Sequence, residues 1–173
     1  MNISITIRPY ISADAPQVRQ LFITVNRLLA PPHLQEAFES YIVRALIEEI
    51  DRIEDYYAEM AGGFWVATFE RRVVGMFGLE RIGSDAMELR RMYIEPSVRR
   101  AGVARQLLLF AEECIRREVS RLELSTSELQ AAAVSLYRSS GYELLRKEAV
   151  DAASNKTIGG GIQRFYFQKI LGR

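Results

Sequence analysis

The sequence is poor in three residue types that often carry enzyme chemistry. It has one cysteine and one histidine, Cys114 and His33. An internal disulfide, a Cys/His metal centre and a histidine-based catalytic triad are therefore not expected, and we predict no metal site. The 23 basic residues include only three lysines, Lys147, Lys156 and Lys169, so a catalytic lysine is not expected either.

Long apolar runs and an excess of charge are also missing. No stretch approaches the ~18 consecutive apolar residues of a membrane-spanning helix, and the first residues do not have the pattern of a secretory signal. The formal net charge is +1, which excludes a strong global attraction to nucleic acid or to an anionic membrane. We therefore expect a cytoplasmic protein with no nucleic-acid or membrane partner.

The length and the remaining composition are those of one globular domain. Of the 173 residues, 49% are hydrophobic and 26% are charged, which is enough apolar material for a core and enough charge for a hydrated surface. No internal repeat, linker or low-complexity tract divides the chain. We expect a single domain over residues 1–173.

Hydrophobic spacing predicts the order of the elements. Strands are expected at 3–8, 64–70, 73–80, 87–95, 122–124, 142–146 and 162–170, and helices at 12–29, 34–60, 102–119 and 127–139. The last two helices alternate with strands, which indicates a parallel pair in the middle of the sheet and antiparallel hairpins around it. The predicted fold is α/β (α+β), a mixed sheet of six to seven strands flanked by four helices.

The segment from Arg99 to Ala104 joins a strand to a helix and is the strongest functional signal. A helix N-terminus exposes unpaired N–H groups and partial positive charge, which suits a phosphate. Gly102 lets a diphosphate approach the backbone closely. The segment lacks the Gly-Lys-Ser/Thr ending of a Walker loop and is not a GxGxxG motif. The alternative is a glycine that only eases helix–strand packing.

This segment resembles motif A of the GNAT superfamily, the Gcn5-related N-acetyltransferases, whose pattern is Q/R-x-x-G-x-G/A. The matching residues are Arg99, Gly102 and Ala104. The run Glu88–Pro96 looks like the family's fourth strand, and Ala133–Tyr142 is similar to its A-x-x-L-Y-x-x-x-G-F/Y motif. The resemblance spans about residues 3–171 and implies the GNAT fold, in which the central parallel strands splay apart.

The resemblance also implies where acetyl-CoA, the expected co-substrate, would bind. The family's diphosphate site falls here on backbone N–H groups of Arg99, Arg100, Ala101, Gly102, Val103 and Ala104, with Arg105 at the edge. The pantetheine arm would pair with main-chain groups of Met92, Tyr93 and Ile94. One of these N–H groups could hold the thioester oxygen in an oxyanion site.

Two side chains are the expected catalytic groups. The amine must lose a proton before it attacks, and Glu88 stands where many family members carry a base, on the strand face shared with Arg90, Met92 and Ile94. The alternatives are a Glu88 that only pairs with a neighbouring Arg, and Glu80 as the base. Tyr137 occupies the family's acid position and would protonate the departing thiolate; its alternative is a core aromatic.

Several positions depart from the family pattern or have a second interpretation. Arg100 stands where the family often has Gly, and Arg is tolerated there if the φ of this residue is negative. Gln130 stands where many members have Asn, and is expected to reach the pantetheine or the acceptor. Ser125–Ser127 is expected to cap the next helix, the alternative being a lining of the acceptor slot. The acidic run Glu48–Asp55 is expected to be a solvated helix face, or one that attracts cationic amines.

The sequence thus predicts an N-acetyltransferase that acts on a primary amine of a small molecule or amino-acid-like acceptor by direct attack, without an acyl-enzyme. Three alternatives remain: a CoA-binding sensor with the same fold, an enzyme for protein or peptide amines, and a nucleic-acid binder that uses its many Arg residues. A homodimer is a further expected partnership. The identity of the acceptor does not follow from the sequence.

Overall fold

The structure, a computed structural model, describes residues 3–172. In that range seven strands form one sheet in the order β1-β2-β3-β4-β5-β7-β6. The strands are β1 (Thr6–Pro9), β2 (Gly63–Phe69), β3 (Arg72–Arg81), β4 (Ala86–Ile94), β5 (Arg121–Ser127), β6 (Glu143–Val150) and β7 (Ile162–Ile170). Among these strands, β4 and β5 are the one parallel pair and every other pairing is antiparallel, which confirms the predicted sheet.

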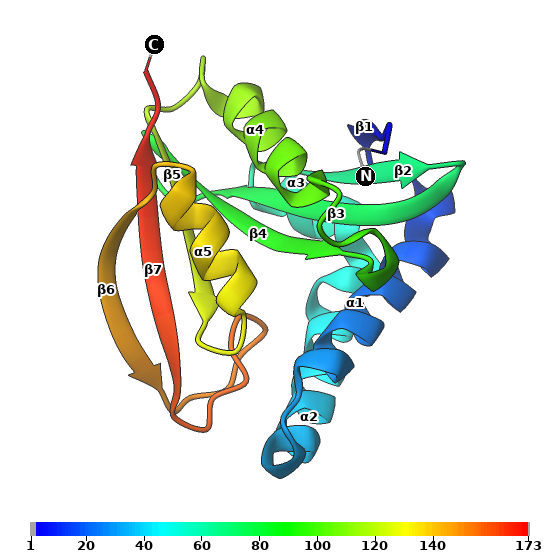
Figure 1. The fold of residues 1–173 in the computed structure, drawn as a ribbon, viewed down its shortest axis with the longest axis vertical. Helices are drawn as coiled ribbons and strands as arrows, with labels where there is room; N and C mark the ends of the chain where they lie inside the picture. Colours follow the sequence, from blue (N-terminus) through cyan, green and yellow to red (C-terminus); the bar gives the residue numbers. More distant parts are fainter. Residues whose placement is uncertain (1–2, 173) are drawn as a thin grey trace.

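Helices pack on both faces of the sheet (Figure 1). On one face lie α1 (Ala15–Leu29), α2 (Gln35–Glu48) and α3 (Ile53–Glu59), and on the other α4 (Val103–Ile115) and α5 (Ala131–Ser139). Neighbouring residues of β3 face opposite sides: Met76 belongs to the core under α1–α3, and Phe77 to the core under α4 and α5. No helix in the described range is long and apolar enough to cross a bilayer.

All four expected helices are present, but the second is divided. It ends as α2 at Glu48, passes through a short 3-10 turn at Ile50–Arg52 and resumes as α3. Glu49 lies at the break, with φ −139° and ψ −62°, and its side chain is 0% exposed. The prediction that Glu49 belongs to a solvated acidic face is therefore wrong, because the break turns this carboxylate into the protein.

The parallel pairing between β4 and β5 is short. It joins Ala86–Leu89 to Arg121–Leu124 and stops there, although both strands continue. Beyond this point β5 remains paired with β7 through its other edge, while β4 remains paired with β3. The two central strands therefore diverge, and Figure 1 shows the resulting V. Within residues 3–172, each leg therefore has a main-chain edge that faces the gap and pairs with no strand.

A β-bulge lies in β4 where the divergence begins. Gly78 pairs with Arg90 and Met76 with Tyr93, so Arg91 and Met92 together stand opposite one residue of β3. Arg91 has φ +55°, and the bulge directs both Arg90 and Arg91 toward the α1–α3 side. Met92 and Ile94 pack instead with the α4 core. The prediction that they share a face with Glu88 is wrong for this reason.

Candidate active site

The turn between β4 and α4 presents a row of free backbone donors. The N–H groups of Arg99 and Ala101 bond inside the turn, to carbonyls 3.3 Å away. Five further N–H groups donate to no acceptor among residues 3–172, those of Arg100, Gly102, Val103, Ala104 and Arg105. Gly102 has φ +74°, a conformation that glycine adopts without strain. The turn therefore has the donors that a diphosphate needs.

Three arginines surround this turn. Arg99, Arg100 and Arg105 are exposed, and none of them forms an ion pair with a carboxylate in the described part of the chain. The Arg105 side chain donates to the Ser139 hydroxyl at 3.3 Å, its one hydrogen bond among residues 3–172. Arg100 has φ +67°, so the negative φ at which Arg would be tolerated is not the one that the residue adopts. The backbone of Arg100 is in the left-handed conformation, which glycine adopts without strain, and this explains why glycine would suit the position.

The free edge of β4 leads from this turn toward the splayed gap. Glu95 N–H donates to the Val74 carbonyl of β3 at 2.8 Å. Since the main-chain groups of a strand alternate sides, those of Tyr93 also face β3, and those of Met92 and Ile94 face the gap. Met92 and Ile94 therefore present the N–H and C=O groups with which an extended ligand could pair.

A pocket lies between the two legs of the V. Its walls come from β4, the end of β5, α5 and the residues just before it, helices α1 and α2, and the segment between β6 and β7 with the adjoining strand ends. Five of the predicted site residues line it together: Glu88, Met92, Tyr93, Gln130 and Tyr137. Ile94 and the turn at 99–105 lie outside its walls. The predicted site thus divides into a turn and a pocket, joined by the edge of β4.

Tyr137 reaches this pocket from α5. Its ring packs edge-on against Tyr142 and at a tilt against Phe167, with centroids 5.8 and 5.9 Å away, and the side chain is almost fully buried. Burial, and to a smaller degree the neighbouring Tyr93, raises the pKa of Tyr137 above its usual value. The phenol therefore stays protonated at neutral pH and keeps a proton to donate. Tyr137 is both a packed aromatic and a pocket residue.

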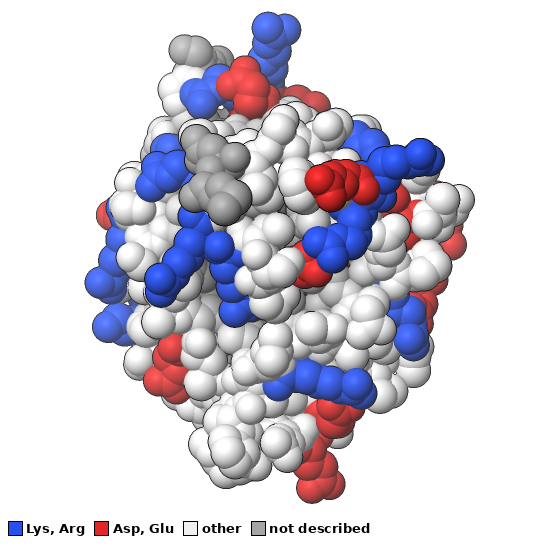
Figure 2. Space-filling view, turned by 45° about the vertical axis from the view of Figure 1, so that its right-hand side comes forward, with Lys and Arg blue, Asp and Glu red and all other residues white. Residues whose placement is uncertain are grey.

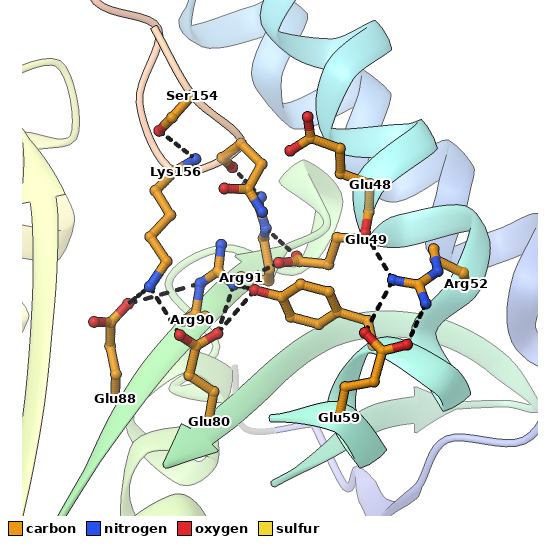
Figure 3. Close-up of polar contacts among 12 residues, drawn as sticks. Glu48, Glu49, Arg52, Glu59, Glu80, Glu88, Arg90, Arg91, Ser154 and Lys156 are labelled. Carbon is orange, nitrogen blue, oxygen red and sulfur yellow. Dashed lines mark hydrogen bonds and ion pairs between the residues drawn. The ribbon is translucent and has the colours of Figure 1, made fainter. Parts of the chain in front are cut away.

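Glu88 enters the pocket from β4 and is partnered by a lysine. Lys156 Nζ lies 3.3 Å from Glu88 Oε1 and 2.8 Å from Glu80 Oε1 (Figure 3). Burial alone would raise the pKa of Glu80, but its bonds to Lys156 and Arg90 outweigh this and lower it. The lowered pKa makes Glu80 a weak base. The sequence analysis did not expect a catalytic lysine and did not name Lys156 as a site residue.

Behind the pocket lies a buried ion cluster (Figure 3). Arg90 forms an ion pair with Glu49 at 2.6 Å and donates to Glu80 at 2.8 Å. Glu49 accepts a hydrogen bond from Arg91 Nε at 2.5 Å. Arg91 donates further to the Tyr41 hydroxyl and to the backbone carbonyl of Asn155. The sequence analysis missed this cluster. Its signal was Arg90-Arg91 inside an otherwise buried strand, since two buried guanidiniums need carboxylate partners.

The hydroxyl run at the end of β5 lines the pocket and does not cap α5. Ser125 Oγ accepts from Arg164 at 2.9 Å, and Thr126 donates to Gln130 Oε1 at 2.8 Å. The N-terminus of α5 has no side-chain cap, so the predicted capping role is wrong. Because Gln130 accepts through Oε1, its amide N–H groups are the ones left to face a ligand.

Comparison with known protein families finds a match for the central part of the chain. Residues 60–144 match the family model described as the acetyltransferase (GNAT) domain. This range covers β2 through α5, and with them the free edge of β4, the turn at 99–105 and Tyr137.

Individual relatives agree with this match. The chain is 33% identical over 98 residues to an uncharacterized N-acetyltransferase, YjgM, of Escherichia coli K12, covering 54% of this chain and 59% of that protein. It is 31% identical over 132 residues to N-acetylaspartate synthetase of Danio rerio, covering 75% of this chain and 46% of that protein. It thus spans about half the length of these curated relatives.

A solved structure extends the likeness to the whole fold. The PaiA N-acetyltransferase of Thermoplasma acidophilum, determined in complex with coenzyme A, superposes with a TM-score of 0.73 at 19% identity, over 97% of this chain and 99% of that one. The fold, the family model and the motifs at 99–104 and 133–142 all agree. The chain belongs to the GNAT acetyltransferase family.

Proposed function

We propose that this chain is an acetyl-CoA-dependent N-acetyltransferase that acetylates a primary amine of a small molecule or amino-acid-like acceptor. One observation supports this most strongly: the free-donor turn at 99–105 and the free edge of β4 lead into a pocket lined by both Glu88 and Tyr137. A relative named for the synthesis of N-acetylaspartate supports an amino-acid-like acceptor.

The cofactor end of the site fits the chemistry of acetyl-CoA. The five unengaged N–H groups and the three unpaired arginines at the turn suit its phosphates. The Met92 and Ile94 main-chain groups suit the amides of its pantetheine arm. Met92, which also lines the pocket, would then donate its N–H to the thioester oxygen as negative charge develops there.

At the acceptor end, the ammonium group of Lys156 lies between the carboxylates of Glu80 and Glu88. This is a position where a positively charged amine is stabilised. We propose that the acceptor's ammonium replaces that of Lys156 there and loses its proton to Glu88, directly or through water. The amine nitrogen then attacks the thioester carbonyl carbon. A C–N bond forms and the nitrogen loses its second proton to solvent. The C–S bond breaks, and Tyr137 donates its proton to the departing thiolate and regains one from solvent.

The alternative functions have weaker support. A nucleic-acid binder would need unpaired surface arginines, yet many here pair with carboxylates: Arg19 with Asp51, Arg27 with Glu39, and Arg52 with Glu59. Figure 2 shows acidic side chains interspersed with basic ones over much of one face. A protein acceptor is disfavoured because the 151–161 segment closes on the pocket through Asn155 and Lys156. The cytoplasmic location and the homodimer stay predictions.

The test is release of free thiol from acetyl-CoA in the presence of a panel of primary amines. Amine-dependent release, with stoichiometric N-acetyl product seen by mass spectrometry, is the expected result. If CoA binds but no amine accelerates thiol release, a CoA-binding sensor replaces the enzyme. If Tyr137→Phe turns over as fast as the wild type, the acid assignment is wrong.

A further inference from the structure

The charged side chains that line the pocket fall into two groups. Arg90, Arg91, Lys156 and Glu88 belong to the paired ion cluster, whose other carboxylates are Glu49 and Glu80. Three cations there face three carboxylates, so the cluster offers no net charge to a ligand. Arg164 is the remaining charged side chain of the pocket wall.

Arg164 has no carboxylate partner within residues 3–172. Its Nη2 donates to Ser125 Oγ at 2.9 Å, and this hydroxyl is its one side-chain partner in that range. Glu148 stands directly opposite it on β6, but Glu148 pairs with Arg146 at 3.4 Å instead. A guanidinium has five N–H donors, so most of those on Arg164 remain available. The side chain has turned away from a neighbouring carboxylate and toward the pocket.

The register of the sheet places Arg164 on the acceptor side. Glu88 pairs with Glu123, and Ser125, two residues further along β5, is on the same face. The Arg164 guanidinium meets Ser125 on that face. The turn at 99–105 opens α4, which packs on the opposite face of the sheet. The phosphates of the cofactor are therefore not the natural partner of Arg164.

A half-buried, unpaired guanidinium on a pocket wall is complemented best by a planar anion, since its parallel N–H groups match the two oxygens of a carboxylate. We infer that the acceptor is a primary amine that also carries a carboxylate, as amino acids do, and that Arg164 is the residue that selects it. This inference rests on the proposed function and assigns the acceptor class to the same site.

The experiment compares free amino acids with the corresponding amino-acid amides as acceptors in the thiol-release assay. The two members of each pair have the same amine, but only the acid carries the carboxylate that Arg164 is inferred to bind. The wild type should favour the acid by ~10- to 100-fold in kcat/KM. Arg164→Gln should lose that preference through a higher KM for the acid, with little change for the amide. Arg164→Lys should retain part of the preference, since it keeps the charge and loses the paired donors.

Lys147→Gln is the matched control, because Lys147 lies on the adjacent strand, is exposed with its ammonium over the Phe165 ring, and does not line the pocket. It should leave the acid-to-amide ratio unchanged, and thermal unfolding should show that both variants fold. The inference is overturned if Arg164→Gln leaves the ratio unchanged, if it slows acid and amide equally, or if the wild type acetylates amines and prefers the amides. Absence of thiol release with every amine would instead contradict the proposed function.

Discussion

Glu88 and Tyr137 line one pocket from opposite faces of the sheet. Glu88 lies on the face that carries Glu80 and α3, whereas Tyr137 packs with Phe167 in the core under α4 and α5. The two faces communicate only because β4 and β5 separate after Leu89. A proton can thus be removed on one side of the gap and supplied on the other, which is what transfer of an acetyl group from a thiol to an amine needs.

Replacement of Tyr137 by Phe should lower kcat by roughly 10²-fold and leave the KM for acetyl-CoA nearly unchanged, because the ring is kept and only the proton donor is lost. Since the pKa of Tyr137 is raised, the phenol stays protonated below its ordinary pKa of ~10, and no alkaline fall in rate is expected from it there. Tyr142→Phe is the control: its ring contacts Tyr137, but it does not line the pocket. Equal losses in the two variants would mean that Tyr137 acts only through packing.

Glu88→Gln should reduce kcat/KM for the amine by roughly 10²-fold at neutral pH, where the acceptor is mostly protonated. The deficit should shrink as the pH approaches the ~10 of an alkylammonium, because the amine then arrives without its extra proton. Steady-state rates across that pH range measure this. The control is Glu123→Gln, which removes the cross-strand neighbour of Glu88 outside the pocket. A loss independent of pH would rule out Glu88 as the base.

Arg100→Gly should stabilise the protein by about 1 kcal/mol, because φ +67° suits glycine and strains arginine. For a chain of this size the melting temperature should rise by about 2–4 °C. The KM for acetyl-CoA should increase at the same time, since a positive side chain is lost from the turn. The control is Arg99→Gly, which should bring no such stabilisation because Arg99 has φ −60°, an unstrained value for arginine. If both variants are equally destabilised in urea unfolding, left-handed strain is not present at Arg100.

Glu49→Gln should lower the free energy of unfolding by about 3–5 kcal/mol, since it leaves Arg90 and Arg91 buried without their shared carboxylate. Glu48→Gln, one residue earlier and exposed, should change it by less than about 0.5 kcal/mol. Denaturant unfolding of the two variants side by side makes the comparison. Similar small losses would show that the cluster does not depend on Glu49.

The order of the elements along the chain, the parallel pair and the four expected helices could be predicted because they follow from local periodicity and from motifs. The details that could not be predicted depend on irregular backbone. The bulge at Arg91 adds one residue to β4 and reverses the faces of Met92 and Ile94, which simple alternation cannot show. The helix break at Glu49 could not be predicted from local sequence either, because it depends on buried arginines that lie 41 residues later or more.

The turn and Tyr137 could be recognised from the sequence because each lies within a short continuous motif. Lys156 and Arg164 could not, since they come from a loop and a strand that reach the pocket only after β6 and β7 have paired. Their roles depend on which charges are already satisfied, and those pairings are long-range. A sequence pattern records a residue's chemistry but not its partners.

The most direct single measurement is thermal unfolding with and without coenzyme A at a concentration about 100-fold above its Kd. The turn and the free β4 edge exist only in the folded chain, so CoA should stabilise it by about 2.7 kcal/mol. This corresponds to a rise of roughly 5–10 °C in melting temperature, and Gly102→Asp should abolish it by placing a carboxylate beside the free N–H groups. No shift at millimolar CoA, in a protein that melts cooperatively, would contradict a cofactor site at Arg99–Arg105 and the acetyltransferase that depends on it.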